Sequence, residues 1–306
     1  MACHSQNADQ VKFGVAGNPP NFFKSQFRKE RGLSPAWLAQ IGLDALEIQC
    51  TYGVRMPHKR AELFKEQSET HNIVLSIHAP YYVSISTSDT IVKQRTTNEL
   101  KKCLQLADII GSKRVIFHPG SAYKNRQESL ENACNFMRDF GSTVDCGFVR
   151  FYPEIGGKIG QLGSLSEIIE ICKSNTITIP CLDLAHHHAR TNGSLMNEYD
   201  YERLFALVSS ELGKESFNNM HIHMYPVSYT SKGESSHKAF SDIINLPEQK
   251  DFLDDRDSTA ENYFPRYEHL LPVVKKLGLN PIIICEAKDS QDIGALEMKN
   301  YYNGLE

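Results

Sequence analysis

Short apolar runs alternate with helical segments along the whole chain, and this alternation constrains the fold more than any other feature. Eight runs have the length and apolar character of buried strands, at residues 11–16, 45–49, 73–78, 114–118, 148–154, 177–183, 220–224 and 281–286. Helical segments are predicted over residues 59–70, 90–110, 127–140, 164–172, 200–212, 264–277 and 293–302. Strand–helix alternation indicates a parallel sheet, and eight units predict a closed (β/α)₈ barrel, the α/β TIM-barrel fold.

No linker or change of composition interrupts this alternation, which predicts one TIM-barrel domain over residues 11–306, preceded by a polar tail over residues 1–10. The tail lacks the apolar segment of a signal peptide, and no apolar run approaches the roughly 18 residues that cross a bilayer. The eight cysteines form no CxxC pair, and several lie inside apolar runs, as reduced, buried thiols do. We therefore expect a cytoplasmic protein that does not contact membranes, and we expect it to act as a monomer.

The charge balance leaves the class of partner open. The 33 basic and 37 acidic residues give a formal net charge of −4, so bulk basicity provides no argument for nucleic-acid binding. A local groove or bound divalent cations could still supply the positive field that a phosphate backbone needs.

Residues of metal-binding type end six successive predicted strands. In a barrel the carboxyl ends of all strands converge on one face, where barrel enzymes carry their sites. The six residues are His78, His118, Glu154, Asp183, His221 and Glu286. A single strand-end histidine is more often structural, but three imidazoles and three carboxylates together have the composition of a two-metal site.

Such a site suits phosphodiester cleavage. Two cations could generate hydroxide at neutral pH and contact both the attacking and the leaving oxygen. Glu154 or Glu286 is the natural bridging ligand or the base that orients the attacking water.

A further cation site is indicated by residues near Asp183 and in the long connection over residues 226–264. His186 lies three residues beyond Asp183, and with Glu234 and His237 it could hold another ion. Glu234 could equally be a solvated loop charge.

Three more histidines lie next to these positions in the sequence. His223 is two residues beyond His221, so on a strand the two side chains share a face, and His223 could be a ligand or a hydrogen-bond donor behind the ligands. His187 and His188 follow His186 and are expected to face solvent.

Two aromatic residues, Tyr81 and Tyr82, follow His78 after Ala79 and Pro80. They could stack on a base or wedge into a duplex, although packing on the barrel rim is an equal alternative. Basic residues on the predicted site face could meet phosphates, while each alone would be an ordinary surface charge. These are Lys124, Arg126, Lys158, Arg190, Lys232 and Lys238.

The order and spacing of these residues resemble the endonuclease IV family of zinc-dependent apurinic/apyrimidinic endonucleases, which have a xylose-isomerase-like TIM barrel. The resemblance covers about residues 11–302. Its motifs are His78-Ala-Pro-Tyr81, His118-Pro-Gly, Pro153-Glu154, Asp183-Leu-Ala-His186, Met220-His221-Ile-His223 and Cys285-Glu286. The Gly-Glu-x-x-His segment over residues 233–237 is similar to the archaeal form of the family.

The resemblance implies two or three zinc ions, with manganese as an alternative metal. By position, His78, His118 and Glu154 would bind the first ion. Glu154, Asp183, His221 and Glu286 would bind the second. His186 and His237 would bind the third, with Glu234 as the substitute carboxylate, because Ser235 stands where the family has an aspartate. The family's N-terminal Gly-x-His motif is absent from residues 15–18.

The implied activity is hydrolysis of the phosphodiester 5′ to an abasic site in duplex DNA, as in base excision repair, by a metal-activated hydroxide. The implied partner is abasic-site duplex DNA, with Tyr81 or Tyr82 filling the gap that the flipped nucleotide leaves. Two alternatives remain: a sugar isomerase or epimerase on the same barrel, and a non-catalytic metal- or nucleic-acid-binding relative.

Overall fold

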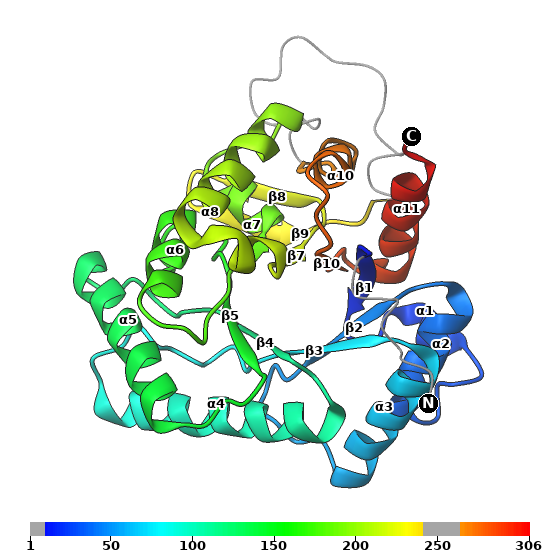
Figure 1. The fold of residues 1–306 in the computed structure, drawn as a ribbon, viewed down its shortest axis with the longest axis horizontal. Coiled ribbons are helices and arrows are strands. Elements are labelled where there is room, and N and C mark those ends of the chain that lie inside the picture. Colours follow the sequence, from blue (N-terminus) through cyan, green and yellow to red (C-terminus); the bar gives the residue numbers. More distant parts are fainter. Residues whose placement is uncertain (1–9, 241–263) are drawn as a thin grey trace.

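Eight parallel strands form the centre of the molecule in the computed structural model, which describes residues 10–240 and 264–306 (Figure 1). Neighbouring strands are hydrogen-bonded in the order β5-β4-β3-β2-β1-β10-β7-β6. Their bounds are β1 Lys12–Ala16, β2 Ala45–Gln49, β3 Val74–His78, β4 Arg114–Phe117, β5 Arg150–Pro153, β6 Cys181–Asp183, β7 His221–His223 and β10 Ile282–Cys285. Two parallel bridges, Phe151↔Thr178 and Glu154↔Cys181, join the two ends of this sheet. The predicted TIM barrel is therefore confirmed.

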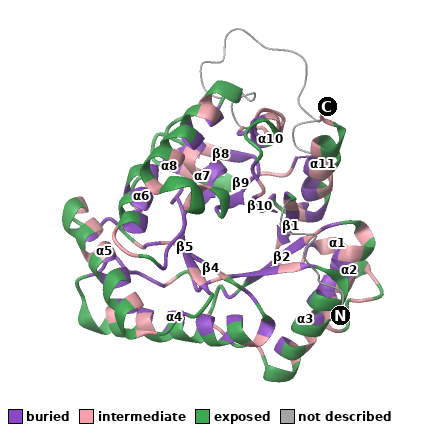
Figure 2. Ribbon diagram, in the orientation of Figure 1, coloured by how far each residue is buried: buried purple, intermediate pink, exposed green. Residues whose placement is uncertain are grey.

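The helices form a ring outside the strands (Figure 1). Their bounds are α1 Pro20–Lys24, the 3₁₀ helix η1 Arg31–Leu33, α2 Ser34–Ile41, α3 His58–His71, α4 Thr90–Ile110, α5 Arg126–Thr143, α6 Leu165–Lys173, α7 Leu184–Arg190, α8 Glu198–Asn218, α10 Tyr267–Lys276 and α11 Gln291–Gly304. Figure 2 shows buried residues on the strands and on the inner helix faces, with exposed residues outside. Among the described residues, no helix is long and apolar enough to cross a membrane.

Local signals explain where the longest predicted helix begins and ends. The side chain of Asp89 accepts hydrogen bonds from the backbone N–H groups of Ile91 and Val92 at the start of α4. Gly111, with φ of 73°, ends the helix in the left-handed conformation that glycine adopts without strain. Leu100, Leu104 and Ala107 recur at helical spacing and are buried, which places this face of α4 against the sheet.

Two differences from the prediction lie beside the predicted site. The histidines after Asp183 belong to the short helix α7, because the Asp183 side chain caps it by accepting from the His186 N–H at 2.6 Å. The connection after β7 contains an antiparallel hairpin of β8 (Val227–Thr230) and β9 (Gly233–His237). Residues 241–263 of this connection, and residues 1–9 of the predicted tail, lie outside the described residues.

Candidate metal centre

Glu154 is the central residue of the site. It follows β5 directly and is 1% exposed. Its Oε2 lies 2.9 Å from His78 Nε2 and 3.5 Å from His118 Nδ1. Its Oε1 lies 3.2 Å from His223 Nδ1 and 3.5 Å from His186 Nδ1. One buried carboxylate with two imidazoles on each oxygen has the geometry needed to bridge two cations.

The first cluster consists of His78, His118 and Glu154, whose ligand atoms lie within 4.8 Å of one another. His78 Nδ1 lies 3.0 Å from the backbone carbonyl of Ala79. Because a carbonyl only accepts hydrogen bonds, Nδ1 carries the hydrogen, and the Nε2 of the neutral ring offers its lone pair to the site.

The two histidines of this cluster differ in their affinity for protons. Burial alone would lower the pKa of His78, but the hydrogen bond and charge of Glu154 raise it to about 9. Burial lowers the pKa of His118 to about 4, so its ring is neutral and available as a ligand. Burial would raise the pKa of Glu154, but His118 and His223 hold it well below its usual value. The cluster is therefore built around a carboxylate anion that a positive charge must balance.

The second cluster consists of Asp183, His223 and Glu286. His223 Nδ1 lies 3.6 Å from Asp183 Oδ2 and 3.8 Å from Glu286 Oε1. The buried hydroxyl of Tyr225 donates to Asp183 Oδ2 at 3.0 Å and fixes that carboxylate. Together with Glu154, these residues offer one imidazole and three carboxylates, a donor set that fits zinc or manganese.

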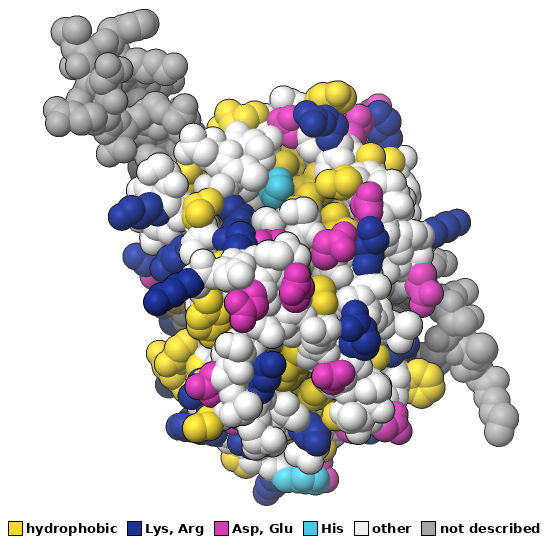
Figure 3. Space-filling view, turned by 90° about the vertical axis from the view of Figure 1, so that its left-hand side faces the viewer, with side chains coloured by type: hydrophobic (Ala, Val, Ile, Leu, Met, Phe, Trp, Pro, Cys, Tyr) yellow, Lys and Arg dark blue, Asp and Glu magenta, His cyan; other side chains and the backbone are white. Residues whose placement is uncertain are grey.

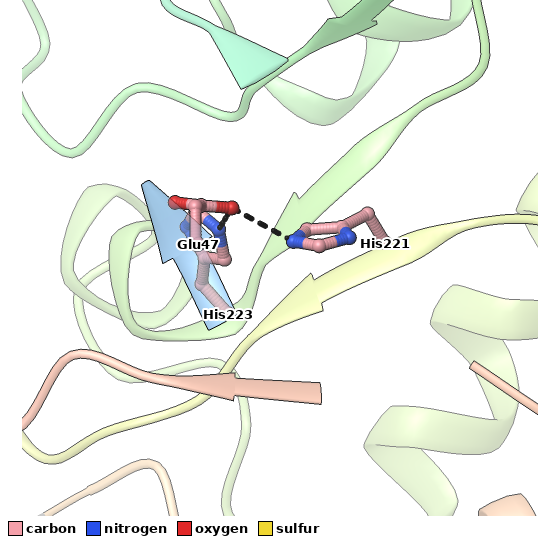
Figure 4. Close-up of side chains that lie close together, drawn as sticks. All are labelled: Glu47, His221 and His223. Atoms are coloured by element: carbon pink, nitrogen blue, oxygen red, sulfur yellow. Dashed lines mark hydrogen bonds and ion pairs between the residues drawn. The ribbon is translucent and has the colours of Figure 1, made fainter. Parts of the chain in front are cut away.

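His221 does not lie in the second cluster, contrary to the sequence-based ligand set. In the sheet, Asp183 pairs with His223, whereas His221 pairs with Cys181, one layer deeper in the barrel. The two histidines share a face, as predicted, but only His223 reaches the end of the strand. His221 Nε2 instead lies 2.9 Å from Oε2 of Glu47, as Figure 4 shows.

The third cluster consists of His186, Glu234 and His237. Glu234 joins the other two, with Oε2 lying 3.1 Å from His186 Nε2 and Oε1 lying 3.1 Å from His237 Nε2. Ser235, at the position where the resembled family has an aspartate, is exposed. Burial would lower the pKa of His237, but Glu234 and Glu286 raise it to about 8.

Backbone carbonyls orient both histidines of the third cluster. His186 Nδ1 lies 2.8 Å from the carbonyl of Ile155, and His237 Nδ1 lies 3.0 Å from the carbonyl of Glu286. Each ring therefore directs its Nε2 toward Glu234. His186 also borders Glu154 and Asp183, so it links the third cluster to the other two.

The glycine-rich loop after β5 packs over the third cluster. A Cβ on Gly157 would lie 2.5 Å from His186 Cδ2 and 2.6 Å from Glu234 Oε2, so this position has room only for glycine. Arg190 donates to the carbonyls of Gly156 and Lys158 at 3.0 and 2.7 Å. Arg126 likewise donates to carbonyls of this loop. The two arginines expected to meet phosphates therefore hold the loop in place.

The other candidate contact residues differ in their exposure to solvent. Tyr81 is 64% exposed and lies edge-on to Tyr52, which is 72% exposed. Tyr82 is more covered, with the guanidinium of Arg95 5.2 Å from its ring centroid. Lys124, Lys158 and Lys232 are exposed, and Lys238 is partly buried. On the flank of the molecule shown in Figure 3, basic and acidic side chains are interspersed.

Besides His221, sequence reasoning misplaced His188, and it missed three site residues. His188, expected at the surface, is fully buried and stacks on Phe264 at 5.8 Å, whereas His187 is half-buried. The missed residues are Glu47, Tyr52 and Tyr225. Of these three residues, only Glu47 could have been identified from the sequence. A carboxylate inside an otherwise apolar strand needs a buried partner, which indicates a role inside the barrel.

Known proteins share this architecture. An uncharacterized protein of Methanocaldococcus jannaschii is 27% identical over 269 residues, which are 86% of this chain and 89% of the relative. A probable endonuclease 4 of Mycoplasma genitalium is 26% identical over 212 residues, which are 62% of this chain and 70% of the relative.

Two solved structures align over almost the whole chain. Endonuclease IV from Thermus thermophilus superposes with a TM-score of 0.65 at 16% identity, covering 97% of this chain and 100% of that one. A D-tagatose 3-epimerase-like protein superposes with a TM-score of 0.64 at 17% identity, covering 96% and 97%. At these identities the likeness shows the fold alone. Residues 35–302 match the family described as xylose isomerase-like TIM barrel, and the chain belongs to that family.

Proposed function

We propose that this protein is a metal-dependent endonuclease that cleaves the phosphodiester 5′ to abasic sites in duplex DNA. The observation that carries the proposal is the continuous set of three clusters, in which Glu154 joins the first two and His186 joins them to the third. An isolated small-molecule site would not need the third cluster. The relative named probable endonuclease 4 supports the same assignment.

The donor sets fit two or three zinc ions, with manganese as the alternative metal. His78, His118 and Glu154 would hold one ion, and Glu154, Asp183, His223 and Glu286 would hold a second. His186, Glu234 and His237 would hold the third. Bound cations would supply Lewis acidity toward the phosphate and would lower the pKa of a coordinated water.

The two glutamates assigned to catalysis differ in how far their side chains are exposed to solvent. Glu154 is enclosed by four imidazoles and 1% exposed, which suits a bridging ligand. The Glu286 side chain is 14% exposed and borders His223, while the Glu286 backbone carbonyl contacts His237 of the third cluster. Burial and the charges of Glu154 and Glu47 raise the pKa of Glu286, so it binds a proton more readily than an ordinary glutamate. Glu286 would therefore orient the attacking water and accept its proton.

Residues on the rim would hold the DNA. Tyr81, three residues beyond His78, and Tyr52 present exposed rings that contact each other, and base stacking on such rings tolerates any sequence. Tyr81, rather than the more covered Tyr82, would fill the gap left by the flipped abasic nucleotide. Exposed lysines on the neighbouring loops, Lys124, Lys158 and Lys232, would meet the phosphates.

The test is incubation with duplex DNA that carries one stable abasic analogue, in the presence of zinc or manganese. We expect incision on the 5′ side of the analogue and no cleavage of the matched undamaged duplex. Glu286→Gln should abolish incision while leaving the fold intact. Absence of incision under all these metal conditions, together with turnover of ketohexoses, would overturn the proposal.

A sugar epimerase is the second candidate. Glu154, Asp183, His223 and Glu286 form a complete single-metal set by themselves, and the superposition on a D-tagatose 3-epimerase-like protein is as close as that on the endonuclease. Elemental analysis distinguishes the two candidates, because three bound ions per chain would favour the nuclease and one would favour the epimerase.

A further inference from the structure

Glu47 is a buried carboxylate that none of the three clusters includes. It lies in the middle of β2 and is fully buried. Its Oε2 faces His221 Nε2 at 2.9 Å and His223 Nε2 at 3.2 Å (Figure 4). A buried carboxylate without such partners would strongly destabilise the fold. The two imidazole rings therefore stabilise Glu47 in its buried position.

Two further donors complete the surroundings of Glu47. The Ser76 hydroxyl lies 3.3 Å from Oε2, and the side-chain amide of Gln49 donates to Oε1 at 3.0 Å. All four partners approach with groups that can donate a hydrogen. The carboxylate is therefore held as an acceptor by β2, β3 and β7 together.

This arrangement decides which nitrogen of His223 is free. A carboxylate accepts hydrogen bonds, so His223 Nε2 must carry a hydrogen where it faces Glu47. The neutral ring then has its lone pair on Nδ1. That nitrogen faces Glu154 at 3.2 Å, Asp183 at 3.6 Å and Glu286 at 3.8 Å.

We propose that Glu47 is a positioning residue of the metal centre, which holds His223 in the tautomer whose Nδ1 can bind a cation in the second cluster. His221 contributes the other ring N–H and fixes the rotation of the Glu47 carboxylate. A carboxylate behind a ligating histidine orients the ring and strengthens it as a ligand. The inference rests on the metal centre of the proposed function, but not on the substrate.

The same three side chains have ligand atoms close enough to hold an ion themselves. Such an ion would displace the hydrogen from His223 Nε2 and would require this ring to bind metals through both nitrogens. The distances of 2.9 and 3.2 Å from Glu47 Oε2 to the two ring nitrogens are hydrogen-bond lengths, and they favour hydrogen bonding over a bound ion. The measurements described next distinguish hydrogen bonding from metal binding.

The first measurement needs no variant. In protein labelled with ¹⁵N-histidine and saturated with Zn²⁺, ring ¹⁵N NMR should show His223 protonated on Nε2 and metal-bound on Nδ1. Detection of metal on Nε2 of His223 or of His221 would overturn the proposal.

The second measurement compares Glu47→Gln with Glu99→Gln. Glu99 is a buried carboxylate of α4 that belongs to none of the metal clusters. Glu99→Gln therefore removes one buried negative charge, as Glu47→Gln does, without changing a cluster. Competition with a chromophoric chelator should show roughly 10–100-fold weaker Zn²⁺ binding for Glu47→Gln at one site. Glu99→Gln should bind like the wild type. At saturating Zn²⁺ both variants should hold as many ions as the wild type.

Two results of this comparison would contradict the proposal. Zn²⁺ affinity within about twofold of the wild type would show that Glu47 does not support His223. Loss of one ion at saturation, with the His223 tautomer unchanged, would show that Glu47 is itself a ligand. If the protein failed to cut abasic DNA while Glu47→Gln still weakened Zn²⁺ binding, the proposed nuclease would fall and this inference would stand.

Discussion

The first and third clusters have similar donors but are built from different kinds of structure. His78, His118 and Glu154 stand at the ends of β3, β4 and β5, which are neighbours in the sheet. In the third cluster, His186 comes from the short helix α7, and Glu234 and His237 come from β9 of the hairpin. The barrel itself therefore places the first cluster, whereas packing between added segments places the third.

Exposure does not separate the two clusters, but their attachment to the barrel does. Side-chain exposure runs from 1% at Glu154 to 25% at His118 in the first cluster, and from 7% at His186 to 33% at His237 in the third. The hairpin is attached to the loop after β5 by backbone hydrogen bonds, from Glu234 N–H to Gly157 O at 3.0 Å and from Ile159 N–H to Lys232 O at 3.1 Å. The third cluster can therefore be removed by local changes that leave the barrel and the first cluster in place.

The largest effect is expected from Glu154→Gln. The amide would offer one acceptor instead of two and would turn its NH₂ group toward imidazoles, so the first and second clusters should both lose their ions. Elemental analysis should show this loss, and incision of abasic duplex DNA should be abolished. Glu99→Gln is the control and should keep both properties. A full complement of ions in Glu154→Gln would refute the bridging role.

Glu234→Gln should affect only the third cluster. We expect one ion fewer per chain by elemental analysis, with the other ions retained, and slower incision. Ser235→Ala is the matched control, because Ser235 is the adjacent residue and is exposed. A lower metal content in Ser235→Ala, but not in Glu234→Gln, would show that the carboxylate was assigned wrongly.

Gly157→Ala tests whether the loop after β5 holds the third cluster together. The added Cβ would overlap His186 and Glu234, and overpacking of this kind costs about 1–3 kcal/mol. Urea denaturation should show a loss of stability in this range, accompanied by weaker binding of one ion. At Gly160 no atom lies within 4 Å of an added Cβ, so Gly160→Ala should behave like the wild type. Equal stability of the two variants would contradict the packing argument.

The smallest effect is a pH dependence of the metal-free protein. The pKa values of His78 and His237 are raised to about 9 and about 8 in the folded protein, above the ordinary value of 6.5. Their contribution to stability is complete below about pH 6.5 and is lost as the pH rises through about 9. The melting temperature of the metal-free protein should therefore fall over this range.

Metal should reverse that trend, because cations compete with protons for the same nitrogens and bind better as the pH rises. The comparison of metal-free and Zn²⁺-saturated protein by differential scanning calorimetry provides the control. A metal-free melting temperature that rose between about pH 6.5 and 9 would contradict the assigned charges.

The barrel and most of the residues that converge at its strand ends could be predicted from local sequence patterns. When apolar strands and helices alternate eight times, the common fold is the (β/α)₈ barrel. Residues at the carboxyl ends of its strands lie on one face, and this placement does not depend on the details of side-chain packing. His78, His118, Glu154, Asp183 and Glu286 were therefore placed together before any coordinates. The bounds of α4 were also predicted, because they depend on local hydrogen bonds.

Only the tertiary structure decided which histidine of β7 enters the second cluster. His221 and His223 share a face and a residue type, and the choice depends on the register with β6, which pairs His223 with Asp183. Register also places Glu47 opposite Ser76, and the curvature of the sheet then brings both histidines to its carboxylate. In the same way, contacts across the fold made Glu234 a member of the third cluster and made Arg126 and Arg190 anchors of the loop. Residue types and their spacing are local properties, whereas register and packing depend on segments far apart in the chain.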